Sequence, residues 1–419
     1  MKHSKFYAMA LLMSTALFTI TSCNSSSDDP ETLPIATYSP IGCDPITPLM
    51  LVLNSSNHNA FPLFSAVDAV TDANENFTIS PLSLSEVLAL VSNGANGETR
   101  KQIAEIIGTN GMSKETVNET FNSLNNYLTD ADSKTTFSIA NSMWINEGFE
   151  VKPEFLNDKK LIGETFTQKL SSTKTMSDLN YWCSTKTNGC IKDILSEPLS
   201  EYCEMVIANA LHFKGIWKYQ FDKDCTTELV FTNSDGTKSK VQMMSQKNKL
   251  PIYTGKDFDL VELPYGNDYG FCMDVILPHR DKNLDECMRD FTLDSFEEAI
   301  YLKSNMPEKD VIIQMPKMKL ECKYSLVEPL KAMGVTDAFS DKADFTGITD
   351  RDIYISEVLQ STYVNVDEEG TEAAAATIVE LTEWAGDCPQ LFTMDRPFVY
   401  IIREKNTGAI LFMGKVRKL

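Results

Sequence analysis

Histidine is scarce in this chain, and the short motifs that mark many enzyme sites are missing. Only His58, His212 and His279 remain after the first residues, and no H-E-x-x-H, G-x-S-x-G, Walker-type loop or G-x-G-x-x-G occurs. No C-x-x-C occurs either, so no zinc site or thioredoxin-like redox motif is indicated. These absences argue against an enzyme, a metal centre and a nucleotide cofactor, although a triad can assemble from residues that are distant in sequence.

Positive charge is also in short supply. The 419 residues contain 38 Lys and Arg against 59 Asp and Glu, which gives a formal net charge of −21. A chain this acidic repels nucleic acids, anionic lipid head groups and heparin-like polyanions. We therefore expect no nucleic-acid partner and no polyanionic cofactor. Hydrophobic residues make up 42% of the chain, which is the composition of a packed globular protein.

The N-terminus reads as a targeting segment. Lys2 and Lys5 precede an apolar run over residues 6–20 that is short for a membrane span. The following Ile-Thr-Ser-Cys resembles a bacterial lipoprotein box with Cys23 as the lipidated residue, although Leu is commoner at the position of Ile20. The alternative is an ordinary secretory signal with a chance cysteine.

Polar and acidic residues follow this cysteine. Residues 24–31 read Asn-Ser-Ser-Ser-Asp-Asp-Pro-Glu and resemble the surface-export signals of Bacteroides-type lipoproteins. We predict a signal peptide over residues 1–22, a lipidated flexible tether over residues 23–56 and one folded domain over residues 57–419. The expected location is the outer membrane, at the cell surface or outside the cell, with membrane contact only through the lipid.

Nine cysteines would remain after lipidation, and an odd number leaves at least one thiol without a disulfide partner inside the chain. Export permits disulfides, but their pairing cannot be read from sequence. Several cysteines lie in apolar, strand-like runs, as Cys272 does in residues 269–277, where a buried free thiol is the default.

Helical signals dominate the first half of the chain and strand signals the second half. Ser80-Pro81 looks like a helix cap, and apolar residues at helical spacing follow until Gly94. The short apolar or alternating runs that indicate strands are residues 136–145, 205–213, 241–244, 260–264, 271–278, 311–320, 353–366, 398–402 and 410–413. With helices near 284–304 and 325–333, this order predicts an α+β fold with large mixed sheets.

Residues 366–384 carry the most specific pattern in the chain. An acidic pair and Gly370 precede a run of small residues, and composition alone would favour an alanine-rich helix there. As a strand, however, the segment would place small and then apolar side chains on one face and the early charges on the other. The first face holds Thr371, Ala373, Ala375, Thr377, Val379 and Leu381, and the second holds Glu372, Ala374, Ala376, Ile378, Glu380 and Thr382. The first face could therefore slide into a core at low desolvation cost, and Gly370 supplies the backbone freedom to fold the segment over.

This segment resembles the hinge of a serpin reactive loop, in which an acidic residue, Gly, Thr, Glu and an alanine run follow one another. The matching hinge residues are Glu368, Gly370, Thr371, Glu372, Ala373, Ala374, Ala375, Ala376 and Thr377. Further serpin-like motifs occur in the family's order at residues 77–83, 180–191, 209–217, 263–265, 277–278, 316–318, 330–347, 396–398 and 411–416. The resemblance covers about residues 57 to 419.

The resemblance implies three mixed β-sheets, about eight to nine helices and an exposed reactive loop near residues 368–392. It also implies a monomeric suicide-substrate inhibitor of a serine protease, with a cysteine protease as a second possibility, rather than an enzyme. The family spacing from Gly370 places the cleaved bond between Trp384 and Ala385, which indicates a chymotrypsin-like target. Cleavage one residue to either side would indicate a glutamyl-specific or an elastase-like protease.

The resemblance also implies a polar cluster beneath the point where the main sheet opens. Its members here are Ser80, Ser83, Asn209 and Gln360. Many family members carry histidine at the position of Gln360. Because glutamine still forms hydrogen bonds, we expect a changed barrier to sheet opening and not a loss of inhibition. The alternatives are a non-inhibitory surface binding protein with the same fold and, from another class, a surface hydrolase or glycan-binding lipoprotein.

Overall fold

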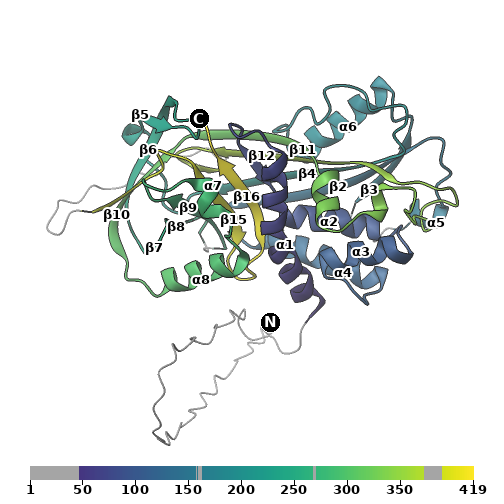
Figure 1. Cartoon of the computed structure of the whole chain (residues 1–419), viewed down its shortest axis with the longest axis horizontal. Coiled ribbons are helices and arrows are strands. Elements are labelled where there is room, and N and C mark those ends of the chain that lie inside the picture. Colours follow the sequence, from purple (N-terminus) through teal and green to yellow (C-terminus); the bar gives the residue numbers. More distant parts are fainter. Residues whose placement is uncertain (1–46, 157, 159–162, 268–269, 372–388) are drawn as a thin grey trace, which may run out of the picture. The chain divides into compact units, whose positions relative to one another are not determined.

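A computed structural model describes residues 47–156, 158, 163–267, 270–371 and 389–419. The described residues form nine α-helices and three β-sheets (Figure 1), as the sequence predicts. The helices are α1 (Pro48–Val70), α2 (Pro81–Ser92), α3 (Gly97–Ile107), α4 (Lys114–Asp130), α5 (Pro153–Leu156), α6 (Thr173–Lys186), α7 (Leu284–Met288), α8 (Leu293–Ser304) and α9 (Val327–Ala332). No helix in this part of the chain has the length and apolarity needed to cross a membrane.

One six-stranded sheet carries the features that matter for function. Its order is β11-β12-β13-β4-β2-β3. The strands are β11 (Met318–Ser325), β12 (Ile355–Val366), β13 (Gly370–Thr371), β4 (Met205–Ile216), β2 (Thr135–Asn146) and β3 (Glu164–Gln168). In Figure 1, α6 lies over one face of this sheet, and α2, α3 and α4 lie on the other side.

The other two sheets contain most of the C-terminal half. The second six-stranded sheet has the order β1 (Phe77–Ile79), β16 (Ile410–Val416), β15 (Phe398–Glu404), β9 (Phe271–Pro278), β8 (Phe258–Pro264) and β7 (Ile252–Thr254). The four-stranded sheet has the order β14 (Gln390–Thr393), β10 (Lys309–Pro316), β6 (Lys238–Leu250) and β5 (Thr227–Thr232).

Helix α2 runs through the interior, because all twelve of its residues are buried. It begins where the sequence predicts, since the Ser80 side chain caps it by accepting a hydrogen bond from the Ser83 N–H, and Pro81 follows at the first position. Trp144, Trp182 and Trp217 are all buried. Cys272 is a fully buried free thiol, also as expected.

Two boundaries differ from the sequence prediction. The tether is predicted to reach residue 56, but α1 already begins at Pro48, with the Thr47 side chain accepting from the Met50 N–H. The polar residues that suggested a linker include Ser56, which is buried on this helix. Residues 311–320, predicted as one strand, are parts of β10 and β11, because the chain passes from one sheet to another at Lys317.

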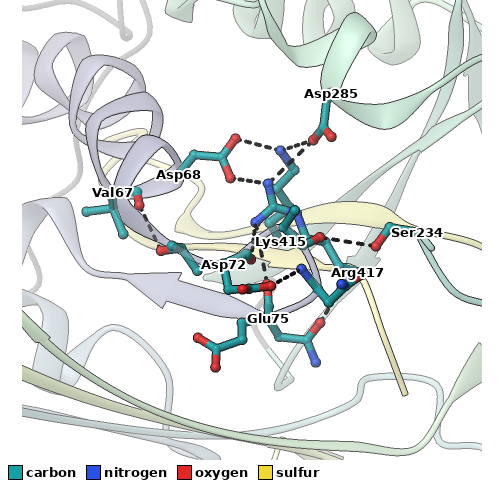
Figure 2. Close-up of polar contacts among 12 residues, drawn as sticks. Val67, Asp68, Asp72, Glu75, Ser234, Asp285, Lys415 and Arg417 are labelled. Atoms are coloured by element: carbon teal, nitrogen blue, oxygen red, sulfur yellow. Dashed lines mark hydrogen bonds and ion pairs between the residues drawn. The ribbon is translucent and has the colours of Figure 1, made fainter.

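A buried ion cluster fixes the C-terminal strand to α1 and α7 (Figure 2). Lys415 of β16 is fully buried, and its Nζ lies 2.7 Å from Asp68 Oδ2 and 2.5 Å from Asp285 Oδ1. The Arg417 guanidinium lies 2.5 Å from the second Asp68 oxygen. The three elements therefore share one network of charges that none of them could satisfy alone.

We expect Lys415→Met to destabilise the fold by about 2–3 kcal/mol, because two carboxylates would lose a buried partner. This is below the roughly 3–5 kcal/mol seen when a fully buried pair is broken, since solvent screens the half-exposed Asp285. Urea unfolding would measure the change. Lys418→Met is the matched control, because that lysine is exposed and 3.9 Å from Asp235. Equal effects of the two substitutions would contradict the prediction.

Candidate functional site at the seam of the large sheet

The seam of the large sheet is the line along which β12 and β4 meet. The two strands run parallel and are paired over eight positions, from Ile355 opposite Met205 to Tyr363 opposite His212. Beyond that point they diverge, and β13 lies between them, antiparallel to both. Thr371 is paired with Val366 on one side and Gly215 on the other. The chain has therefore folded back after β12 and begun an additional strand at the top of the seam.

Gly370 makes this return possible through its lack of a side chain. Its φ is +156°, and a Cβ atom built there would lie 2.0 Å from the Gly215 carbonyl oxygen. A backbone atom cannot give way as a flexible side chain can, so a larger residue would push β13 out of the seam. The sequence suggested a need for backbone freedom at Gly370, and the structure adds the reason of close approach to β4.

Thr371 is held by a hydrogen bond in the core. Its side chain is fully buried, and its hydroxyl lies 2.7 Å from the hydroxyl of Tyr265, which is also fully buried. The Tyr265 ring stacks on Trp217 with the centroids 4.3 Å apart, so the ring has little freedom to move. The first residue of the face predicted to point inward thus occupies an inward position.

We expect Tyr265→Phe to loosen the hinge by about 1 kcal/mol, because the buried Thr371 hydroxyl would lose its partner. Hydrogen exchange of the amides in residues 366–371 should become roughly fivefold faster. Tyr400→Phe is the control, since it removes a 2.7 Å hydroxyl pair with Thr78 at a different place in the core. If hydrogen exchange became equally faster in both variants, the Tyr265 hydroxyl would have no specific role in holding the hinge.

Two acidic residues anchor the base of the hinge. The Glu368 carboxylate is buried and lies 2.7 Å from Lys317 Nζ and 2.8 Å from the Thr226 hydroxyl. Burial alone would raise the pKa of Glu368, but the hydrogen bond from Lys317 and those from neighbouring groups outweigh it, and the pKa lies below its usual value. Glu369 lies 2.6 Å from Lys223. Glu368 thus remains charged at neutral pH, and an ion pair with lysine holds each of the two carboxylates.

The main chain of the same segment is fixed as well. The Phe221 and Trp217 N–H groups donate to the Glu368 and Glu369 carbonyl oxygens, each at 2.9 Å. The Trp217 indole also donates to the Asp367 carbonyl at 3.0 Å. The main chain of residues 367–369 is therefore held by hydrogen bonds from Trp217 and Phe221.

The structure brings together Ser80, Ser83, Asn209 and Gln360, the four residues of the predicted polar cluster. Gln360 of β12 accepts from the Ser80 N–H at 3.0 Å and donates to Asn209 Oδ1 of β4 at 3.4 Å. Ser83 donates to the same Asn209 oxygen at 2.6 Å. The side-chain hydrogen bond from Gln360 to Asn209 thus crosses the seam directly. Glutamine forms it at the position where many family members carry histidine.

Three residues of this region were not singled out as site residues from the sequence. Tyr265 was noted only as part of a motif, and Asn141 and Glu86 were not noted at all. Asn141 accepts from Asn209 at 2.7 Å and donates to Glu86 at 3.0 Å. Glu86 could have been found as the lone charged residue in an otherwise apolar helix, but its partners depend on tertiary packing.

Several predicted site residues lie outside the described part of the chain. They are Cys23 at the lipidation site, Glu372, Ala373, Ala374, Ala375, Ala376 and Thr377 of the hinge, and the pair Trp384 and Ala385 at the reactive bond. Their positions rest on the sequence alone.

A cluster of possible metal ligands at Glu262, Cys272 and Asp274 serves another purpose. Their ligand atoms lie within 4.8 Å of one another, but Arg403 lies 2.8 Å from Glu262 and 2.6 Å from Asp274. Lys303 is 2.5 Å from Glu262. These cations neutralise the carboxylates, so the cluster is an ion-pair network of the core.

The model of the serpin family, described as serine protease inhibitor, matches residues 54–419. The chain belongs to the serpin family. It is 34% identical over 379 residues to an "Uncharacterized serpin-like protein" of Methanosarcina mazei, with 87% of each chain covered. It is 33% identical over 358 residues to the "Leukocyte elastase inhibitor" of Bos taurus, covering 81% of this chain and 92% of the relative.

Solved serpin structures share the same architecture. Human thyroxine-binding globulin in complex with its ligand matches with a TM-score of 0.79 and 26% identity, over 88% of this chain and 99% of that one. Serpins are generally inhibitors and not enzymes, but this relative is named for binding a small molecule. Family membership therefore supports protease inhibition in general, and the hinge must distinguish inhibition from binding.

Proposed function

We propose that this serpin is a suicide-substrate inhibitor of serine endopeptidases that traps the protease by inserting its cleaved loop into the seam. The observation that carries this proposal is β13, which already lies antiparallel between β12 and β4. A strand that continued from Thr371 would complete the sheet, so the start of the insertion path is present in the fold.

The register of β13 specifies where each following residue would go. Gly370 lies opposite Ile216 and Thr371 opposite Gly215, so each further residue would pair with the preceding residue of β4. Ala373, Ala375, Val379 and Leu381 would then lie opposite Phe213, Leu211, Ile207 and Met205. All four of those β4 residues are buried in the core beneath the sheet. The small and apolar face of the loop would thus meet buried residues, although β4 residues of the opposite face, such as Ala208, are buried as well.

The same register brings Thr377 to the polar cluster. It would lie opposite Asn209 on β4 and opposite Gln360 on β12. The 3.4 Å hydrogen bond between these two side chains would break on insertion, and the Thr377 hydroxyl could replace it on both sides. On the outward face, Glu372 would lie opposite Lys214. A threonine at this position therefore suits a loop that inserts.

The chemistry of trapping would begin as ordinary proteolysis. The protease serine adds to the carbonyl of Trp384, the bond to Ala385 breaks, and the new amino group of Ala385 takes the proton. The fourteen residues from Thr371 to Trp384 span roughly 45 Å as a strand, which would carry the acyl-linked protease along the length of the sheet. The barrier to this insertion, and not the free energy of the uncut form, would protect the inhibitor before cleavage.

The choice of protease follows from the proposed bond. Trp384 favours a chymotrypsin-like enzyme with a deep apolar pocket, whereas Glu383 or Ala385 at that position would favour a glutamyl-specific or elastase-like enzyme. Lipidation of Cys23 would place the inhibitor at the outer membrane, at the cell surface or outside the cell. Labelling with a fatty-acid analogue, lost in Cys23→Ala, would test that location.

The test mixes the lipid-free domain with chymotrypsin and with elastase and analyses denaturing gels and the released C-terminal peptide. We expect a stable band at the summed mass and a peptide that begins at Ala385. Cleavage without a trapped complex, across a wider protease panel, would support a non-inhibitory binding protein. A trapped complex whose released peptide begins at another residue would support the trapping mechanism but contradict cleavage between Trp384 and Ala385.

A further inference from the structure

Glu86 is a carboxyl group buried in the middle of the molecule. It lies on α2, where it is the only charged residue among twelve buried ones, and its side chain is fully inaccessible to solvent. A buried charge without a cationic partner is costly, so a carboxyl group kept at such a place needs a structural explanation. The inhibitory scheme proposed above assigns Glu86 no role.

Glu86 stands at the end of a one-way chain of amide hydrogen bonds that starts on the far side of the seam. Gln360 Nε2 donates to Asn209 Oδ1 at 3.4 Å, and Asn209 Nδ2 donates to Asn141 Oδ1 at 2.7 Å. Asn141 Nδ2 then donates to Glu86 Oε2 at 3.0 Å. The chain runs from β12 through β4 and β2 to α2, and only an acceptor can end it.

The other Glu86 oxygen indicates the state of the acid. Glu86 Oε1 is buried without a hydrogen-bond partner, and so is Oδ1 of Asn125, a residue of α4 that approaches the carboxyl group. A proton on Oε1 would turn this unpaired acceptor into a donor, because a neutral carboxyl supplies an O–H and a carboxylate supplies none. The geometry therefore suits the neutral acid when the seam is closed.

We propose that Glu86 is a positioning residue for loop insertion, in which the neutral acid holds the amide chain that closes the seam and loss of its proton favours opening. This inference rests on the proposed inhibitory function, since it concerns the same sheet opening. It predicts that inhibition by this serpin depends on pH through a group that never touches the protease.

The electrostatics agree with the geometry. Burial raises the pKa of Glu86 to about 8, and the hydrogen bonds from Asn125 and Asn141 oppose this rise only in part. No charged side chain of the described residues is among the causes of this shift.

Several titratable side chains on the elements packed against α2 point to another face or are bound by other groups. His212 lies an odd number of residues from Asn209 on β4 and so points to the opposite face of the sheet. On the other elements, Lys415 of β16 binds Asp68 of α1, Lys114 of α4 donates to the Asn93 carbonyl, and Arg100 of α3 donates to the Met112 carbonyl.

The direction of the pH effect follows from linkage. Burial is the cause that raises the pKa, so an opening of the seam that admits water must lower it, and opening must then release a proton. Opening is therefore favoured as the pH rises toward and through about 8. Because one proton is involved, the rate of insertion can rise at most about tenfold per pH unit.

The test uses a synthetic, fluorescently labelled peptide with the sequence of residues 371–384 as a substitute for the cleaved strand. Its uptake by the intact, uncleaved protein is followed by anisotropy between pH 6 and pH 9.5, without any protease. In the wild type we expect the uptake rate to rise about three- to tenfold between pH 7 and pH 9. Glu86→Gln keeps the shape and the acceptor oxygen but cannot ionise, and its rate should stay constant.

Two controls separate this inference from its alternatives. His212→Asn should retain the wild-type pH profile, and a flat profile in that variant would transfer the role to the histidine. An infrared band of a protonated carboxyl should be present in the wild type at pH 6.5, weaken by pH 9.5 and be absent in Glu86→Gln, whether or not that variant takes up peptide. Uptake that does not vary with pH in the wild type would overturn the role of Glu86, whereas no uptake at any pH would overturn the proposed insertion itself.

Discussion

Ala375→Asp should convert this serpin from an inhibitor into a substrate. The register of β13 places residue 375 opposite Leu211, which is fully buried, so insertion would carry a carboxylate into the core. Burying an unpaired charge costs several kcal/mol, and each 1.4 kcal/mol slows a step about tenfold. Insertion slowed by roughly a hundredfold would lose to deacylation, and the trapped fraction should fall to less than about one tenth of the wild-type value while loop cleavage continues.

The control for this substitution lies three residues earlier in the same loop. Glu372→Ser changes a residue that the register assigns to the other face, opposite the half-buried Lys214, and should leave most of the trapping intact. Densitometry of complex and cleaved bands measures both variants. Trapping that survives Ala375→Asp would show that the loop inserts in another register or does not insert.

Cleavage of the loop should raise the Tm of the protein by roughly 10–20 °C. The uncut molecule has eight parallel pairs along the seam, and a new strand of twelve residues would replace them with antiparallel pairs on both sides. At about 1 kcal/mol for each additional hydrogen bond, the gain is on the order of 10 kcal/mol. For a chain of this size, each kcal/mol of added stability raises the Tm by roughly 1–2 °C, which is at or below the lowest values for smaller domains.

Calorimetry or circular dichroism of uncut and cut protein measures this change. Ala375→Asp, cut at the same bond, should show a much smaller rise, which would tie the stabilisation to insertion and not to the nick itself. An unchanged Tm in the cut wild type would support the non-inhibitory binding protein, because the cut loop would then have remained outside the sheet.

Local patterns in the sequence were sufficient for much of the architecture. The cap at Ser80 and Pro81 and the strand at residues 271–278 follow from interactions between near neighbours or from hydrophobic periodicity. The boundary of α1 was misjudged, because the burial of Ser56 depends on what α1 packs against.

The sequence by itself determined the family and the order of helices and strands, and it predicts the small-residue hinge, because each depends on residue type and spacing. Only the tertiary structure decided that Thr371 already lies in the seam, that Gly370 meets the Gly215 carbonyl and that Glu86 ends an amide chain from Gln360. The contacts that hold this region join residues 55 to 280 positions apart in the chain, such as Asn141 with Glu86 and Ser80 with Gln360. Their energies depend on burial and on precise distances between strands, and local sequence carries neither.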